Sequence, residues 1–157
     1  MHQTFCLLFF LALSATLVAQ PSADGWQIST AQRDDYTGIV AANGRIGILP
    51  SPEPFGVKQV ILNNVYDKES PLGVSRVLEG MNFGNLELRI DGRLVTGTNL
   101  TDWRQTLDMK EAKFRTTFTV PGKARVTYDI YALRNLQYAA YIDVSVEALA
   151  DVEVTMT

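Results

Sequence analysis

The chain has 157 residues, a formal net charge of −3, and a single cysteine and a single histidine. This length suits one ordinary domain. The weakly acidic balance has no run of basic residues, which excludes the electrostatic footprint of a nucleic-acid-binding protein, so we expect no nucleic-acid partner.

The chain begins with an uncharged apolar segment, FCLLFFLALSATLV, over residues 5–18. Its length is typical of the core of a signal peptide and is too short for a membrane span. With cleavage after Ala19, the pattern predicts a signal peptide over residues 1–19 and an exported domain over residues 20–157. We expect no membrane association after signal removal. The alternative is a buried N-terminal helix, which would carry some polar residues on its outer face.

The only histidine and the only cysteine, His2 and Cys6, both lie in this first segment. A mature chain without it excludes disulfides, zinc sites with Cys or His ligands, Cys nucleophiles and Ser-His-Asp triads. Carboxylate, hydroxyl, lysine and tyrosine chemistry remains, and we expect no metal and no cofactor.

Turn signals divide the first half of the mature chain into short strands. Asn43-Gly44 and Asp91-Gly92 are typical of hairpin turns between apolar segments. The glycines of NGRIG do not have the spacing of a phosphate-binding loop, so this segment is predicted as a turn. The predicted strands cover residues 39–40, 46–48, 56–62, 86–90 and 93–95, and the predicted loops cover residues 51–54 and 67–72.

Apolar and polar residues alternate through the second half. Phe114, Thr116, Phe118 and Val120 share one face, and a turn follows at residues 121–123. The alternation returns over residues 126–132, 138–146 and 152–156, while residues 110–112 are predicted as a hairpin loop. Period two with one apolar face indicates half-buried antiparallel strands. Turns roughly every 8–12 residues predict an all-β fold, an antiparallel β-sandwich.

The alternation reaches Thr157 with no closing turn. An edge strand that stopped there would leave backbone groups unpaired. We therefore expect the domain to be incomplete at its C-terminus and to belong to a longer protein; the alternative is that the sheet ends there.

Carboxylate pairs are the first candidates for chemistry, because glycoside hydrolysis needs two acids about 5–9.5 Å apart. Asp102 and Asp108 flank Trp103 and lie near Glu111 in the sequence. Asp102 is expected in a turn and Asp108 at a strand end, where capping or a solvated face is the better interpretation.

Two further acidic pairs are weaker candidates. Asp34 and Asp35 precede Tyr36, but neighbouring strand residues point to opposite faces and would not share a substrate. Asp67 and Glu69 offer oxygen ligands for calcium without the spacing of an EF-hand loop.

Aromatic side chains could stack on sugar rings. Trp26, Tyr36, Tyr66 and Trp103 are the candidates, although most aromatics in such strands belong to the core. Asn99 opens an Asn-Leu-Thr glycosylation motif, which matters only in a eukaryotic source.

Four segments follow one another in the order found in the N-terminal domain of glycoside hydrolase family 65, which the chain resembles over residues 26–157. They are NGRIGI (43–48), NNVYDK (63–68), LELRIDG (86–92) and QTLDMKEAKFRTTFTV (105–120). The family includes maltose, trehalose and kojibiose phosphorylases and some α-glucoside hydrolases. After Asn43-Gly44 it usually continues Gly-Val-Arg-Gly, whereas this chain has RIGILP, which indicates a divergent branch.

The resemblance implies a β-sandwich of the galactose-mutarotase-like supersandwich type, followed by an (α/α)6 barrel. In the family that barrel carries the catalytic Glu and would bind the α-glucoside. No catalytic residue transfers to this sequence, and its substrate-binding residues stay unassigned. Residues 106–134 are accordingly predicted as two strands and their turn, not as an active site. The alternatives are a standalone carbohydrate-binding module and a secreted structural module, and a homodimer is left open.

Overall fold

The computed structural model describes residues 25–34, 37–68 and 70–157. These residues form twelve strands and no helix, which confirms the all-β prediction. No helix in these ranges is therefore long and apolar enough to cross a membrane. The strands are β1 Gln27–Thr30, β2 Ala41–Ala42, β3 Ile46–Pro50, β4 Val57–Asp67, β5 Arg76–Glu79, β6 Leu88–Ile90, β7 Arg93–Leu94, β8 Thr101–Asp108, β9 Lys113–Val120, β10 Ala124–Ala132, β11 Ala140–Ala148 and β12 Val154–Met156.

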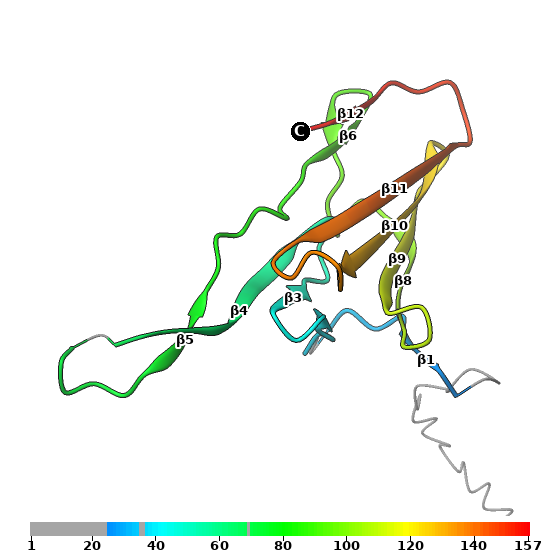
Figure 1. Ribbon diagram of the computed structural model, residues 1–157. Helices are drawn as coiled ribbons and strands as arrows, with labels where there is room; N and C mark the ends of the chain where they lie inside the picture. The colour runs from blue at the N-terminus through cyan, green and yellow to red at the C-terminus, as the bar shows by residue number, and fades with distance from the viewer. Residues whose placement is uncertain (1–24, 35–36, 69) are drawn as a thin grey trace, which may run out of the picture.

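The largest layer is a five-stranded antiparallel sheet in the order β1-β8-β9-β10-β11 (Figure 1). Its period-two pattern places Phe114, Phe118 and Tyr128 on one face, where each is at most 1% exposed. The opposite face carries polar and charged side chains. Residues 106–134, predicted as two strands, include the end of β8 as well as β9 and β10.

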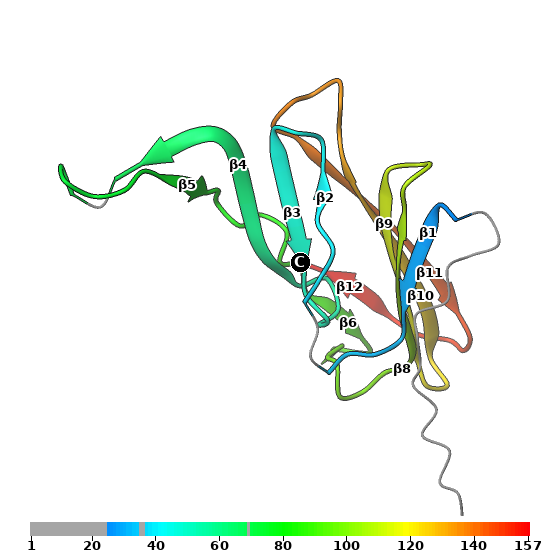
Figure 2. The same cartoon turned by 90° about the horizontal axis from the view of Figure 1, so that it is seen from below.

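Two smaller sheets lie on the apolar side of the large one. One has the order β2-β3-β4-β5 and the other β12-β6-β7. Figure 2 shows β2 and β3 beside β10, and β10 contacts both strands. Ile46, Ile48 and Val60 from the first small sheet join Leu88 and Ile90 from the second in one core with the apolar face of the large sheet. The layers thus form a sandwich, as the alternation predicted.

The predicted hairpin turns occur where the glycines stand. Asp91 and Gly92 both have positive φ, 51° and 73°, as a two-residue turn with the twist of a hairpin requires. Gly44 and Gly122 also have positive φ, 88° and 67°. Residues 110–112 form the predicted loop between β8 and β9.

The strand predicted over residues 39–40 was wrong, because the structure has no strand there and β2 begins at Ala41. Several predicted boundaries were also wrong, among them the start of β6, which is Leu88 and not residue 86. The predicted strand 56–62 continues to Asp67, because β4 runs past the body of the sandwich to pair with β5. Tyr138 lies in the turn before β11, and the strand extends instead to Ala148. The last strand begins at Val154 and pairs with β6 in a small sheet, where all three of its residues are exposed.

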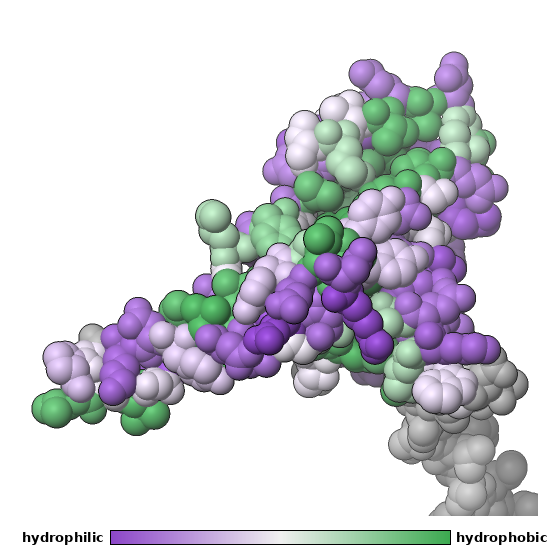
Figure 3. Space-filling view, in the orientation of Figure 1, coloured by the Kyte–Doolittle hydropathy of each residue, from purple (hydrophilic) through white to green (hydrophobic). Residues whose placement is uncertain are grey.

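The β4–β5 ribbon projects from the sandwich as a two-stranded arm (Figures 1 and 2). Its register shifts between Ile61 and Tyr66, where pairing with β5 is interrupted. Apolar side chains lie along the arm and the segment after it, and some show in green in Figure 3. Leu72 is 99% exposed, Met81 90% and Val74 83%. An isolated two-stranded ribbon is only marginally stable in water, so this arm is the least supported part of the described fold.

Candidate functional site

The carboxylates predicted as an acid pair do not come together. Asp102 and Asp108 stand at opposite ends of β8, six residues apart, which corresponds to about 20 Å along a strand. Asp102 was predicted in a turn, and this was wrong. It lies within β8, at an irregularity in the pairing with β9, and its φ is 54°. Trp103 points into the core, 5% exposed, away from both acids. The separation is far beyond the range for glycoside hydrolysis.

Asp108 is a turn cap, as the alternative interpretation predicted. Its Oδ1 accepts the backbone N–H groups of Lys110 at 3.0 Å and Glu111 at 2.9 Å, and its Oδ2 accepts Gln27 Nε2 at 2.7 Å. These bonds, that from Glu111 foremost, hold the pKa of Asp108 below its ordinary 3.8. A catalytic acid needs a raised pKa, so Asp108 is suited to close the β8–β9 hairpin and not to donate a proton.

The other acidic candidates are not assembled into a site either. Asp34 is exposed, and Asp35, Tyr36 and Glu69 lie outside the described residues. Asp67 is exposed at the end of β4 and accepts the N–H of Lys68 at 2.7 Å. Within the ranges that the structure describes, no three His, Cys, Asp or Glu side chains converge as metal ligands.

The predicted sugar-stacking aromatics lie on separate elements. Trp26, 55% exposed, precedes β1, and Tyr66, 57% exposed, lies on the arm. Trp103 is buried under the guanidinium of Arg33, whose Cζ lies 5.8 Å from the ring centroid. These three rings therefore form no common stacking surface.

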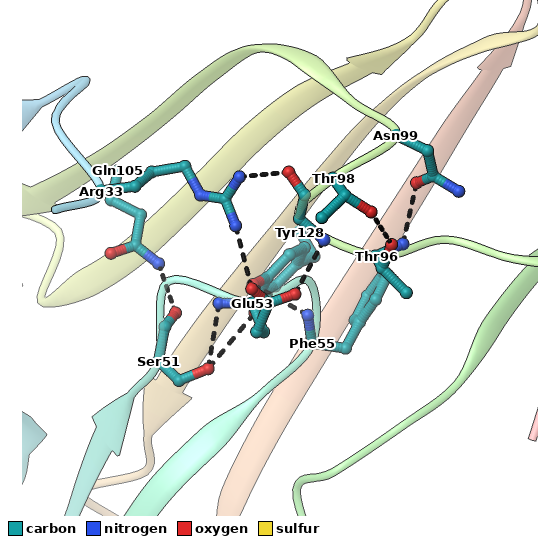
Figure 4. Close-up of polar contacts among 10 residues, drawn as sticks. Arg33, Ser51, Glu53, Phe55, Thr96, Thr98, Asn99, Gln105 and Tyr128 are labelled. Carbon is teal, nitrogen blue, oxygen red and sulfur yellow. Dashed lines mark hydrogen bonds and ion pairs between the residues drawn. The ribbon is translucent and has the colours of Figure 1, made fainter.

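A polar clamp joins three segments beside the core (Figure 4). Arg33 donates from Nη1 to the carbonyl of Gly97 and from Nη2 to Glu53 Oε1 at 3.0 Å. Glu53 Oε2 accepts the N–H of Gly97 at 2.7 Å. We call Arg33, Glu53 and Gly97 the Arg33 clamp. The clamp fixes the N-terminal segment to the loops before β4 and β8. Its only carboxylate, that of Glu53, accepts hydrogen bonds from both Arg33 and Gly97.

A buried polar chain lies under the clamp. Gln105 donates from Nε2 to Ser51 O at 3.1 Å and to Thr116 Oγ1 at 3.2 Å, and the Tyr128 hydroxyl accepts the N–H of Phe55 at 3.1 Å. The Phe55 and Tyr128 rings stack at 4.3 Å. Burial raises the pKa of Tyr128, which keeps its hydroxyl protonated. These hydrogen bonds satisfy backbone groups of the loop at residues 51–55. The side chains that make them are buried and closed to substrate.

A cleft of about 470 Å³ lies between the β6–β7 hairpin and the β9–β10 turn. Asp91 and Lys123 form an ion pair in it at 2.7 Å. Asn99, of the glycosylation motif, lines the cleft from an exposed turn. Its side chain accepts Thr96 N–H at 2.9 Å and donates to Leu94 O at 3.0 Å. Both ends of the amide therefore hold the turn together.

The polar face of the large sheet carries an organised cluster that the sequence analysis missed. Arg115 donates to both Asp129 oxygens, from Nε at 2.7 Å and from Nη2 at 2.6 Å. Tyr131 donates to Asp129 Oδ2 at 3.3 Å and lies beside Tyr141 on the next strand. The predicted turn at residues 121–123 was the feature from which this pair could have been predicted. In a hairpin, residues at equal distances from the turn lie opposite each other, so Arg115 lies opposite Asp129.

Comparison with known proteins finds two relatives that share one name. The chain is 37% identical over 147 residues to a kojibiose hydrolase of Mucilaginibacter mallensis and 35% identical over 150 residues to a kojibiose hydrolase of Flavobacterium johnsoniae. The matches cover 92% and 94% of this chain. No protein-family model matches, so membership of glycoside hydrolase family 65 stays a prediction. The chain spans 22% of the length of these curated relatives, and is thus similar to one region of two larger glycoside hydrolases.

Proposed function

We propose that the chain is the non-catalytic N-terminal β-sandwich region of an exported glycoside hydrolase that cleaves α-glucosidic disaccharides or oligosaccharides, kojibiose among them. The observation that carries the proposal is the similarity to two kojibiose hydrolases over nearly the whole chain. The geometry is consistent with a supporting role, because Asp102 and Asp108 are far apart and Asp108 is committed to capping. Catalysis and binding of the scissile bond belong, on this proposal, to polypeptide outside this chain.

Export favours hydrolysis over phosphorolysis. A sugar phosphate formed outside the cytoplasm is charged and does not recross a membrane unaided, whereas a free monosaccharide is neutral. The apolar segment at residues 5–18, followed by Ala19, supports export by way of a signal peptide. The reaction we propose is inverting, with a general acid that protonates the leaving oxygen and a base that activates water.

The test begins with the intact mass of the native gene product and its products from kojibiose. We expect a mass well above the 17.4 kDa of this chain, and glucose release without added phosphate. Proton NMR during the first turnovers should show β-glucose from the cleaved α-linked residue. Formation of glucose-1-phosphate that depends on phosphate would overturn hydrolysis, and release of the α-linked residue as α-glucose, beyond the α-anomer that the reducing-end residue supplies, would overturn inversion.

Two controls separate the parts of the proposal. The 157-residue chain alone should release no glucose, and release by it would contradict a non-catalytic role. Mass spectrometry of the exported protein should find Gln20 as its first residue. A retained N-terminus in a cytoplasmic fraction would overturn export and leave the assignment to a hydrolase intact.

A further inference from the structure

We propose that the polar face of the large sheet binds a neutral glucose oligosaccharide at a surface formed by Arg115, Asp129, Tyr131 and Tyr141, which we call the tyrosine face. This inference rests on the proposed function, because it assigns a sugar-binding surface to the region that lacks the catalytic groups.

The surface follows from strand register. Tyr131 on β10 lies directly opposite Tyr141 on β11, and Asp129 lies directly opposite Arg115 on β9. Residues 129 and 131 are two apart on β10, so both side chains point to the same polar face. Two phenol rings and one guanidinium therefore lie side by side across three strands.

The charged part of the surface is fixed in place before any ligand arrives. Asp129 has a side chain only 7% exposed, and both of its oxygens are occupied by Arg115. This planar two-bond contact is the most directional form of the ion pair. Two of the five N–H groups of Arg115 are used, and the side chain stays 43% exposed. The remaining N–H groups can donate to hydroxyl groups of a sugar.

The aromatic part offers a ring to solvent. The Tyr131 and Tyr141 centroids are 6.1 Å apart with planes tilted by 33°, so the two rings do not cover each other. Tyr141 is 52% exposed. An aromatic face carries partial negative charge and attracts the weakly positive C–H groups on the flat side of a pyranose. Next to it, Tyr131 is held by Asp129, and burial with the nearby carboxylate raises the pKa of its hydroxyl, which stays neutral.

The chemistry selects a neutral sugar over a charged ligand. Arg115 is neutralised by Asp129, so an anion gains little from the guanidinium. Asp143 lies opposite Asp129 on β11 and is exposed, which disfavours anions further. Lys113, opposite Tyr131 on β9, is engaged by Glu111. A ligand that accepts hydrogen bonds and presents an apolar C–H face without net charge fits both halves of the surface.

Binding is tested on residues 20–157, the part of this chain that remains after signal removal on the proposed function, by saturation-transfer NMR and titration with kojibiose and with maltotetraose. We expect wild type to bind at least one of the two. Tyr141→Ala should weaken binding about five- to tenfold, because it removes the exposed ring. Tyr138→Ala is the matched control, since Tyr138 is 50% exposed but lies off the tyrosine face, before β11. The control should bind within about twofold of wild type, and an unchanged far-ultraviolet spectrum should show that both variants fold.

Every outcome decides the inference. Absence of binding by folded wild type at 10 mM sugar overturns it, as does equal loss in Tyr138→Ala and Tyr141→Ala. If inorganic phosphate or a sugar phosphate binds more tightly than the neutral sugar, the choice of ligand is overturned. Hydrolysis of kojibiose by the native gene product, measured separately, would stand even if the tyrosine face bound nothing.

Discussion

The Arg33 clamp makes the most specific prediction, because a side chain at residue 97 would meet the ends of two side chains, Arg33 and Glu53, which must move aside. A Cβ at this position would lie 1.7 Å from Arg33 Nη2 and 2.5 Å from Glu53 Oε1. Both distances are far inside van der Waals contact, so Gly97→Ala must displace the guanidinium. The displacement removes the bond from Arg33 to Gly97 O and the contact of Arg33 with the Trp103 ring.

The cost can be estimated from these lost contacts. A hydrogen bond from a charged group contributes about 1.5–3 kcal/mol, and a cation–π contact about 0.5–1 kcal/mol. The ion pair with Glu53 adds about 0–1 kcal/mol, because Glu53 is 58% exposed and screened by solvent. Arg33 and Glu53 are flexible and partly exposed, so they can move aside and bond to water instead, and we expect Gly97→Ala to lower the free energy of unfolding by about 1–2 kcal/mol.

Urea unfolding of a double-mutant cycle tests the cause of this loss. If the clash with Arg33 is the larger cause, Gly97→Ala should cost at least about 0.5 kcal/mol less in an Arg33→Ala background, where only the close approach to Glu53 Oε1 remains. The slopes with denaturant should stay equal across the four proteins, so that the midpoints compare directly. An equal cost of Gly97→Ala in both backgrounds, or a cost below about 0.5 kcal/mol in wild type, would refute the role of the clamp.

Three further predictions concern other parts of the fold. Tyr128→Phe removes the acceptor of the buried Phe55 N–H, and should lower the free energy of unfolding by about 1–3 kcal/mol in urea titrations; a loss near zero would show that water replaces the hydroxyl. The pKa of Asp108 in the folded state lies below its ordinary 3.8, so the stability that this carboxylate contributes is present above pH 3.8 and is lost as the pH falls through the folded pKa. The urea midpoint should therefore fall between pH 5 and pH 2 in wild type, and should fall less in Asp108→Asn. Leu72→Ser with Met81→Ser should change stability by less than about 0.5 kcal/mol while reducing aggregation in light scattering, and a large loss of stability would show that the arm is packed.

The strand pattern was predictable because it depends on local chemistry. Alternation from Phe114 to Val120 places one side chain in two on the core, and glycine at residues 92 and 122 supplies the positive φ of the turns. The capping role of Asp108 also followed from its place at a strand end. In each case the physical cause acts over a few residues, so the sequence shows it directly.

The candidate site was harder to predict, because its members meet only across strands. Whether Trp103 faces the core could not be predicted from the alternation, because the irregularity at Asp102 shifts the phase of β8. Arg115 and Asp129 are separated by fourteen positions and become partners only through the register of the hairpin. Side-chain direction along a strand reverses with a shift of one residue, so small errors of register hide such pairs.

The sequence alone thus determined an all-β chain, its main hairpin turns, and the absence of Cys and His from residues 20–157. Only the tertiary structure decided that Asp102 and Asp108 stand apart, that β4 and β5 form a projecting arm, and that Arg115, Asp129, Tyr131 and Tyr141 share one surface. Turns and alternation arise from local sterics and the period of the strand, which residue types reveal. Distances between side chains on different strands depend on pairing and register, which arise only when the whole core packs.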